Sequence, residues 1–175
     1  MATVPDNGGY FAFSVVLILD SDATGALGVC LHRLSEYSLE DALPGWADLV
    51  CPPKAMFAGG PVSENGAICV ARVADPDEDP PSWRRVFGSV GLLHLDTPIE
   101  LVEGAFTDMR IFAGYAGWEP GQLEAEIARG SWWVVSARHE DIFGVDPQGL
   151  WARVLRRQGG ELGQFSTWTD DPDAN

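Results

Sequence analysis

Runs of apolar residues predict a series of short strands along the chain. Residues 13–19 (FSVVLIL) are continuously apolar and rich in β-branched side chains, as expected of a strand buried on both faces. Turn-forming residues follow, and residues 26–31 (ALGVCL) then predict an antiparallel partner, so the chain begins with a hairpin. Further strands are predicted at 54–58, 66–73, 109–113 and 132–136, with two more inside 83–95 around a central Gly-Ser pair.

Start and stop signals predict about three helices, most of them in the second half of the chain. The first begins at Thr97, where Pro98 suits the first helical position and Glu100 completes a capping box. The second runs from Pro120 to Gly130, and the third from Asp146 to Gly159. A further short helix is predicted at 38–43. Since strands outnumber helices and do not alternate regularly with them, the pattern predicts an α+β fold.

The length of 175 residues and a hydrophobic content of 46% fit one domain over residues 1–175 with a substantial core. Residues 74–82 (ADPDEDPPS) combine acidic residues with proline, a composition that buries little apolar surface. We therefore expect a mobile surface loop at 74–82. The acidic residues 169–175 are expected to form a frayed tail.

The charge balance disfavours a nucleic-acid partner. Asp and Glu number 26 against 11 Lys and Arg, which gives a formal net charge of -15. Such a field repels phosphate backbones, so DNA contact would require a local basic patch. Positive charge is concentrated only at Arg84, Arg85, Arg153, Arg156 and Arg157.

The sequence also predicts a cytoplasmic protein. No apolar run is long enough to span a bilayer, and the acidic residues after the first strand do not fit a signal peptide. The three cysteines are an odd number without CxxC spacing, which indicates neither a disulfide framework nor a zinc site. We expect no membrane partner.

Candidate catalytic chemistry is limited to one pair. Cys30 and His32 are two residues apart on a predicted strand, so they share a face and could form a thiolate–imidazole pair. The alternative is that Cys30 packs in the core, as free cysteines usually do. Ser14 lies outside any GxSxG motif, and Glu124 and Glu126 are expected to be solvated helix positions. The histidines lack metal-ligand spacing, so we predict no metal site. We also predict no cofactor and no catalytic residue.

Two glycine-containing segments are more informative. FAGGPV (57–62) and FAGYAGWEPGQLE (112–124) each follow a predicted strand, and GYAGW is predicted to be a tight turn. An anion site at the helix start is disfavoured, because Pro120 removes a donor and Glu119 already supplies negative charge. Two interpretations remain: turns that let the strands pack closely, or a recognition groove lined by Tyr115 and Trp118.

The segments SVVLIL, DATGALGVCLHR, FAGGPV and RIFAGYAGWEPGQLEAEIARGSWWVV together resemble the YqgE/AlgH family of bacterial proteins. LPGWADL and GLWARVLRRQGGEL resemble its actinobacterial branch in particular. The resemblance implies a single-domain α+β fold, with a bifurcated mixed sheet bent into a pseudo-barrel, and a cytoplasmic role. Some members of that family are labelled transcriptional regulators.

The chain departs from the family pattern at three places. Only residues 2–5 are available for the usual N-terminal strand, which suggests an exposed sheet edge and a homodimer. The pattern N-R-P after the second strand appears as His32-Arg33-Leu34, and a basic pair is replaced by Ala12 and Phe13.

These observations favour a non-enzymatic binding or regulatory module. A groove between FAGGPV and GYAGW would hold a small molecule or a protein segment, with aromatic contact area, close approach at the glycines and one charge partner. Its predicted ligand-binding residues are Arg33, Gly59, Gly60, Pro61, Gly114, Tyr115, Gly117 and Trp118. The alternatives are a transcriptional regulator that contacts DNA and a hydrolase using Cys30 and His32, which would need a solvent-accessible thiol.

Overall fold

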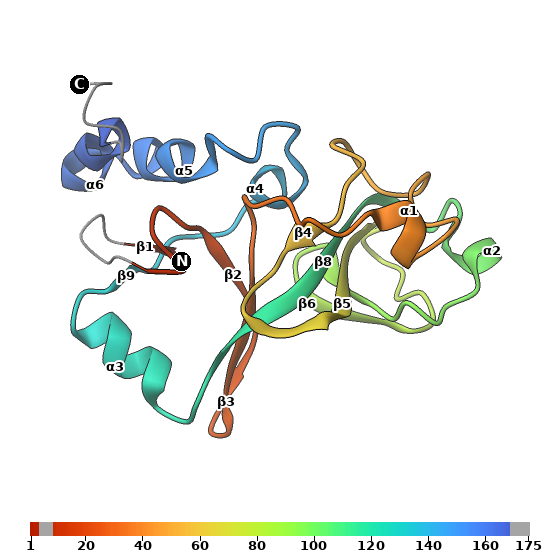
Figure 1. The fold of residues 1–175 in the computed structure, drawn as a ribbon, viewed down its shortest axis with the longest axis horizontal. Helices are drawn as coiled ribbons and strands as arrows, with labels where there is room; N and C mark the ends of the chain where they lie inside the picture. Colours follow the sequence, from red (N-terminus) through yellow and green to blue (C-terminus); the bar gives the residue numbers. More distant parts are fainter. Residues whose placement is uncertain (4–8, 169–175) are drawn as a thin grey trace.

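The computed structural model describes residues 1–3 and 9–168 (Figure 1). The two longest strands, β5 (Val62–Val73) and β8 (Phe106–Trp118), lie side by side at the centre of the main sheet. Within the described residues the sheet has seven strands in the order β2-β3-β8-β5-β7-β6, and β4 pairs in parallel with β8. The short strands β1 and β9 form a second sheet. The strands are β1 Ala2–Thr3, β2 Val16–Asp22, β3 Gly25–Cys30, β4 Phe57–Ala58, β5 Val62–Val73, β6 Trp83–Phe87, β7 Val90–Leu93, β8 Phe106–Trp118 and β9 Trp132–Trp133.

The main sheet bends until its two edge strands face each other. Arg84 on β6 forms an ion pair of 3.2 Å with Asp20 on β2, although these strands stand at opposite ends of the strand order. In Figure 1 the β2–β3 hairpin lies at the lower centre, β5 and β6 lie on the right, and β8 crosses between them. The predicted single-domain α+β fold, with a mixed sheet bent into a pseudo-barrel, is confirmed.

Alternation along the strands divides the core between the two faces of the sheet. On β5, Val70 belongs to the inner cluster, whereas Cys69 and Ala71 belong to the outer one. Helices α4 and α5 close the inner cluster through Ile142, Leu150 and neighbouring apolar residues. Residues from α1, α2 and the segment between α1 and β4 cover the outer face.

The prediction of about three helices is wrong, because the described residues contain six. The four predicted segments each contain a helix, but α4 and α6 were not predicted. Five-residue helices carry little periodicity, and α4 owes its stability to burial of Ile142 and Phe143. The helices are α1 Leu39–Ala42, α2 Ile99–Val102, α3 Gln122–Ala128, α4 His139–Phe143, α5 Leu150–Gln158 and α6 Gly160–Gln164, followed by a 3-10 turn at Phe165–Thr167.

The tight turn predicted at GYAGW is also wrong. Strand β8 continues through these residues to Trp118 and pairs with β3. Gly114 has a φ of 65° and lies beside a register shift between β5 and β8. A positive φ suits glycine here and changes which side chains face the inner cluster.

Tertiary contacts modify two further expectations. Residues 74–82 lie at the surface, and the Arg85 guanidinium donates to the Pro76 and Glu78 carbonyls and to the Asp79 carboxylate. Their mobility stays a prediction. At the N-terminus the expected exposed edge is not found at residues 2–3, which are fully buried and pair with β9. The predicted tail at 169–175 lies outside the described residues.

Candidate functional site

A cleft opens at the end of the pseudo-barrel, between the tip of the β2–β3 hairpin, the start of β6 and the end of β7. Its volume is about 1090 Å³. The floor is formed by half-buried side chains of the inner cluster, one from each of four strands, namely Leu27, Ile68, Leu92 and Tyr115. We call this the barrel-mouth cleft. Barrel mouths are common ligand sites, because their strands leave apolar side chains there without a covering layer.

The rim of the barrel-mouth cleft is mostly acidic. Four carboxylates line it, against one arginine and one histidine; the six residues are Asp20, Asp22, Asp96, Glu119, Arg84 and His94. Hydrogen bonds from the side chain and backbone of Thr24 lower the pKa of Asp22, so this carboxylate is ionised at neutral pH. The rim therefore favours positive charge, in keeping with the net charge of -15.

The structure divides the predicted ligand-binding residues into two groups. Tyr115, Gly117 and Trp118 line the barrel-mouth cleft. The remaining five do not, namely Arg33, Gly59, Gly60, Pro61 and Gly114. Gly59 and Gly60 pack directly on β8, where a methyl group at Gly60 would overlap the Tyr115 carbonyl. The two segments therefore touch, and the cleft lies on one side of them.

Arg33 lies beside a different aromatic residue. Its guanidinium carbon is 4.8 Å from the centre of the Tyr10 ring, and Nη2 is 3.5 Å from the Ala12 carbonyl oxygen. This cation–π contact gives Arg33 a local partner away from the barrel-mouth cleft.

Trp118 is 6% exposed, so most of its indole belongs to the core. Its Nε1 donates to Glu126 Oε2 at 3.0 Å, and Trp132 Nε1 donates to the same oxygen at 2.8 Å. The expectation that Glu126 is a solvated helix position is therefore wrong. Burial alone would raise the pKa of Glu126, but hydrogen bonds from Trp132, Gln122 and Trp118 outweigh it and lower that pKa.

We expect Glu126→Gln to lower the free energy of unfolding by about 1–2 kcal/mol at neutral pH, because a charged acceptor shared by two indoles is lost. The lowered pKa means that this contribution is present above the ordinary value of 4.5 and is lost as the pH falls below it. Denaturant unfolding of both proteins should show a difference that narrows below pH 4.5. Glu124→Gln, an exposed position on the same helix, is the control and should change stability by less than about 0.5 kcal/mol. A difference independent of pH would contradict this role of the carboxylate.

Cys30 and His32 meet as predicted, with 3.3 Å between Sγ and Nδ1. Cys30 is 0% exposed, and burial raises the pKa of its thiol. Burial, followed by the charge of Arg33, lowers the pKa of His32 to about 4. Both groups are neutral at physiological pH, and the accessible thiol that a hydrolase would need is not found at Cys30. The core-packing alternative fits this position.

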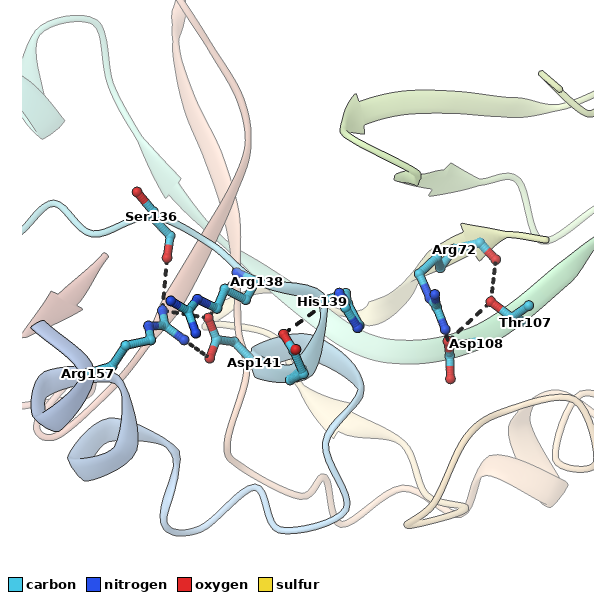
Figure 2. A network of polar contacts seen from close by, with 9 residues as sticks. Arg72, Thr107, Asp108, Ser136, Arg138, His139, Asp141 and Arg157 are labelled. Carbon is cyan, nitrogen blue, oxygen red and sulfur yellow. Dashed lines mark hydrogen bonds and ion pairs between the residues drawn. The ribbon is translucent and has the colours of Figure 1, made fainter. Parts of the chain in front are cut away.

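The arginine concentrations are largely neutralised by nearby carboxylates. The Arg157 guanidinium forms an ion pair with the Asp141 carboxylate, with 2.7 Å from Nη1 to Oδ1 (Figure 2). It also donates a hydrogen bond to the Ser136 carbonyl oxygen. Three other arginines from the same concentrations have carboxylate partners, in the pairs Arg84–Asp20, Arg85–Asp79 and Arg153–Asp146. A DNA phosphate would have to compete with these pairs, which disfavours direct DNA contact.

A metal centre has no evident place in the part of the chain that the structure describes. Within residues 1–3 and 9–168, no group of three or more His, Cys, Asp or Glu side chains is arranged to hold an ion. Nor is any helix in those residues long and apolar enough to cross a membrane.

Several residues of the barrel-mouth cleft were not predicted. Leu27, Ile68 and Leu92 lie in predicted strands, but nothing local distinguishes them from other core positions. Asp20 and Arg84 are 64 positions apart in sequence and meet only because the sheet bends. Tyr115 was found because aromatic and glycine residues cluster around it.

Comparison with known proteins gives a consistent assignment. A family model described as AlgH-like (DUF179) matches residues 2–163. A relative from Streptomyces avermitilis, named UPF0301 protein, is 48% identical over 168 residues, which cover 94% of this chain and 87% of the relative. A UPF0301 protein from Mycobacterium tuberculosis is 41% identical over 167 residues, covering 94% and 83%.

Two solved structures share the fold. A crystal structure of a Corynebacterium diphtheriae protein has a TM-score of 0.88 and 30% identity, covering 95% of this chain and 89% of the other. The solution structure of the AlgH protein from Pseudomonas aeruginosa has a TM-score of 0.69 and 22% identity, covering 97% and 92%.

Proposed function

The chain belongs to the AlgH-like family, and we propose that it is a non-enzymatic, cytoplasmic binding or regulatory protein whose ligand occupies the barrel-mouth cleft. One observation carries this proposal. The cleft keeps a floor of four half-buried apolar or aromatic side chains, one from each of four strands, open to solvent at one end of the pseudo-barrel. A ligand would remove this apolar surface from water, which is favourable by about 25 cal/mol per Å².

The residues of the cleft indicate an amphipathic ligand. Leu27, Ile68 and Leu92 offer apolar contact, and Tyr115 adds a flat ring with a hydroxyl that can donate or accept. The carboxylates of the rim, including Asp22 and Glu119, favour a positively charged group at the entrance. A small molecule and a protein segment both fit this description.

A thermal-shift screen tests the proposal, using metabolites, nucleotides, short peptides and duplex DNA at low salt. A ligand at one hundred times its dissociation constant adds about 2.7 kcal/mol, which raises the Tm of a chain of this size by roughly 5–11 °C. Tyr115→Ala should abolish that shift while the variant stays folded. Tyr37→Ala is the control, because Tyr37 is 51% exposed and does not line the cleft. An equal shift in the Tyr115 variant would remove the cleft as the site.

A further inference from the structure

The two edges of the bent sheet leave an open seam between them. Among the described residues, β2 pairs along its length with β3 alone, and β6 with β7 alone. The strands are antiparallel, since Asp20 meets Arg84 while residues 17–18 and 86–87 line a common cavity farther along. In the part of the chain that the structure describes they form no ladder with each other, and the Asp20–Arg84 side-chain pair bridges them. We call the space between β2 and β6 the seam.

Cavities lie at both ends of the seam. The barrel-mouth cleft includes Asp20 and Arg84, and therefore begins where the ion pair crosses the seam. At the other end lies a second cavity of about 460 Å³, between residues 15–18, the β6 residues Val86 and Phe87, and residues 134–137. Its lining is mostly apolar, and Val134 on its border is 67% exposed. The two cavities and the ion pair follow one line along the edge of β2.

We propose that the seam accepts an extended, basic segment of a partner polypeptide, which adds a strand beside β2 and reaches from the second cavity into the barrel-mouth cleft. Unpaired sheet edges present rows of backbone donors and acceptors that another strand satisfies. The first part of β2 is already covered, because Val16 exchanges backbone hydrogen bonds with Met1. The segment therefore pairs with residues 18–22.

Alternation fixes the pattern of the segment. Side chains on one face of an added strand point into the inner cluster, next to Leu19 and Phe87, and those on the other face point outward. The segment should therefore alternate apolar and polar residues up to the register shift between Ile18 and Asp20; beyond it, a basic side chain reaches Asp20, which lies opposite Leu27 and lines the barrel-mouth cleft. Since β2 and β6 are antiparallel, a strand between them runs antiparallel to only one of them and parallel to the other.

Charge selects the partner. The seam and its entrance carry Asp20, Asp22 and Glu119, and only Arg84 offsets them. Lysine or arginine on the segment can pair with Asp20 in place of Arg84, whose ion pair is more than half exposed and so easily exchanged. A second copy of this chain is a poor occupant, because each copy carries a net charge of -15.

The test uses a ten-residue peptide of alternating valine and lysine, acetylated and amidated at its ends, with the full-length protein. Hydrogen–deuterium exchange should slow at least ten-fold, when the peptide is bound, at those amides of residues 18–22 that do not already bond to β3. Two control peptides distinguish backbone hydrogen bonding from charge. One carries backbone N-methyl groups on alternate residues, and the other has glutamate in place of lysine. Both should bind at least ten-fold more weakly. Equal binding by the N-methylated peptide would overturn strand addition, and equal binding by the glutamate peptide would overturn the charge argument.

Substitutions at the ion pair give an independent readout. Arg84→Ala removes the competitor for Asp20 and should strengthen peptide binding roughly two- to five-fold, the range expected of an exposed ion pair. Arg156→Ala changes the net charge equally at an exposed site outside the seam, and should have at most a small effect. Equal strengthening in both variants would mean that net charge alone is responsible and would overturn the role of Asp20.

This inference rests on the proposed function for the cleft end of the segment, and the two can fail separately. If the peptide does not bind while a small ligand gives a Tyr115-dependent shift, strand addition is wrong and the cleft proposal stands. If the peptide protects residues 18–22 and Tyr115→Ala leaves its affinity unchanged, strand addition stands, but the segment does not reach the cleft floor, and the thermal-shift screen decides the cleft proposal separately. Oligomerisation without peptide binding would overturn the choice of occupant.

Discussion

Replacing Arg110 by methionine is expected to lower the free energy of unfolding by about 3–5 kcal/mol, because three carbonyl groups lose their donor. Arg110 lies on β8 and is 1% exposed. Its guanidinium donates to the carbonyls of Ile142 at 2.6 Å, Pro52 at 2.7 Å and Gly144 at 3.1 Å, and stacks on the Phe57 ring with 4.3 Å between the guanidinium carbon and the ring centre. One side chain thus joins α4 and the loop before β4 to the central strand.

The three backbone carbonyls that Arg110 contacts explain why its replacement lowers the free energy of unfolding. A buried ion pair can often be exchanged for apolar residues without loss, since both charges leave together. Here the acceptors belong to the backbone and remain after the substitution, each costing about 1–3 kcal/mol if it stays buried without a donor. Relief of the buried positive charge offsets part of that cost.

Thermal and denaturant unfolding measure the effect of Arg110→Met, and the Tm should fall by roughly 6–20 °C. Arg156→Met is the matched control at an exposed position, where the change should stay within about 0.5 kcal/mol. If both variants unfold alike, the three carbonyls have other donors and Arg110 does not join these elements.

Arg110 also shows how far a single sequence predicts this structure. Its charge interrupts the apolar run MRIFA, which was correctly predicted as a strand. A charged residue inside such a run indicates buried polar partners, but these partners are carbonyls, which every residue possesses. Nothing in the sequence identifies Pro52, Ile142 and Gly144 as the acceptors.

The candidate site was predictable only where composition marked it. Tyr115 and Gly117 stand out in a glycine and aromatic cluster and do line the barrel-mouth cleft. The floor residues Leu27 and Ile68 have the same local pattern as fully buried strand residues, and only the bending of the sheet leaves them open. The Asp20–Arg84 ion pair depends on the same bending, so periodicity gives no signal for it.

The glycines illustrate an interpretation that was partly right. Close backbone approach was foreseen at Gly59, Gly60 and Gly114, and the structure shows it. The approach was assigned to a ligand, whereas residues 59–60, directly after β4, themselves lie against β8 there. Gly59 donates to the Ala113 carbonyl at 2.7 Å and accepts from the Cys30 amide at 2.8 Å, so this segment is wedged between β3 and β8.

Gly60→Ala should therefore lower the free energy of unfolding by about 3 kcal/mol, at the upper end for overpacking, and lower the Tm by roughly 6–12 °C. The added methyl group would overlap the carbonyl of Tyr115 and approach the amide of Ala116, and backbone atoms cannot move aside as a flexible side chain can. Because Tyr115 forms part of the cleft floor, displacement of β8 should also weaken any Tyr115-dependent ligand.

Gly163→Ala is the matched control, since the nearest atom to its methyl group would be 3.8 Å away and the position lies in helix α6. Alanine there should be neutral or stabilise by about 0.5–1 kcal/mol. If Gly60→Ala were as stable as the Gly163 variant, the backbone at Gly60 would have to separate from β8 without cost, and contact between the two glycine segments would not position Tyr115. We expect the loss of stability and the loss of ligand binding to occur together, because the backbone contact between Gly60 and Tyr115 both holds residues 59–60 against β8 and positions the cleft floor.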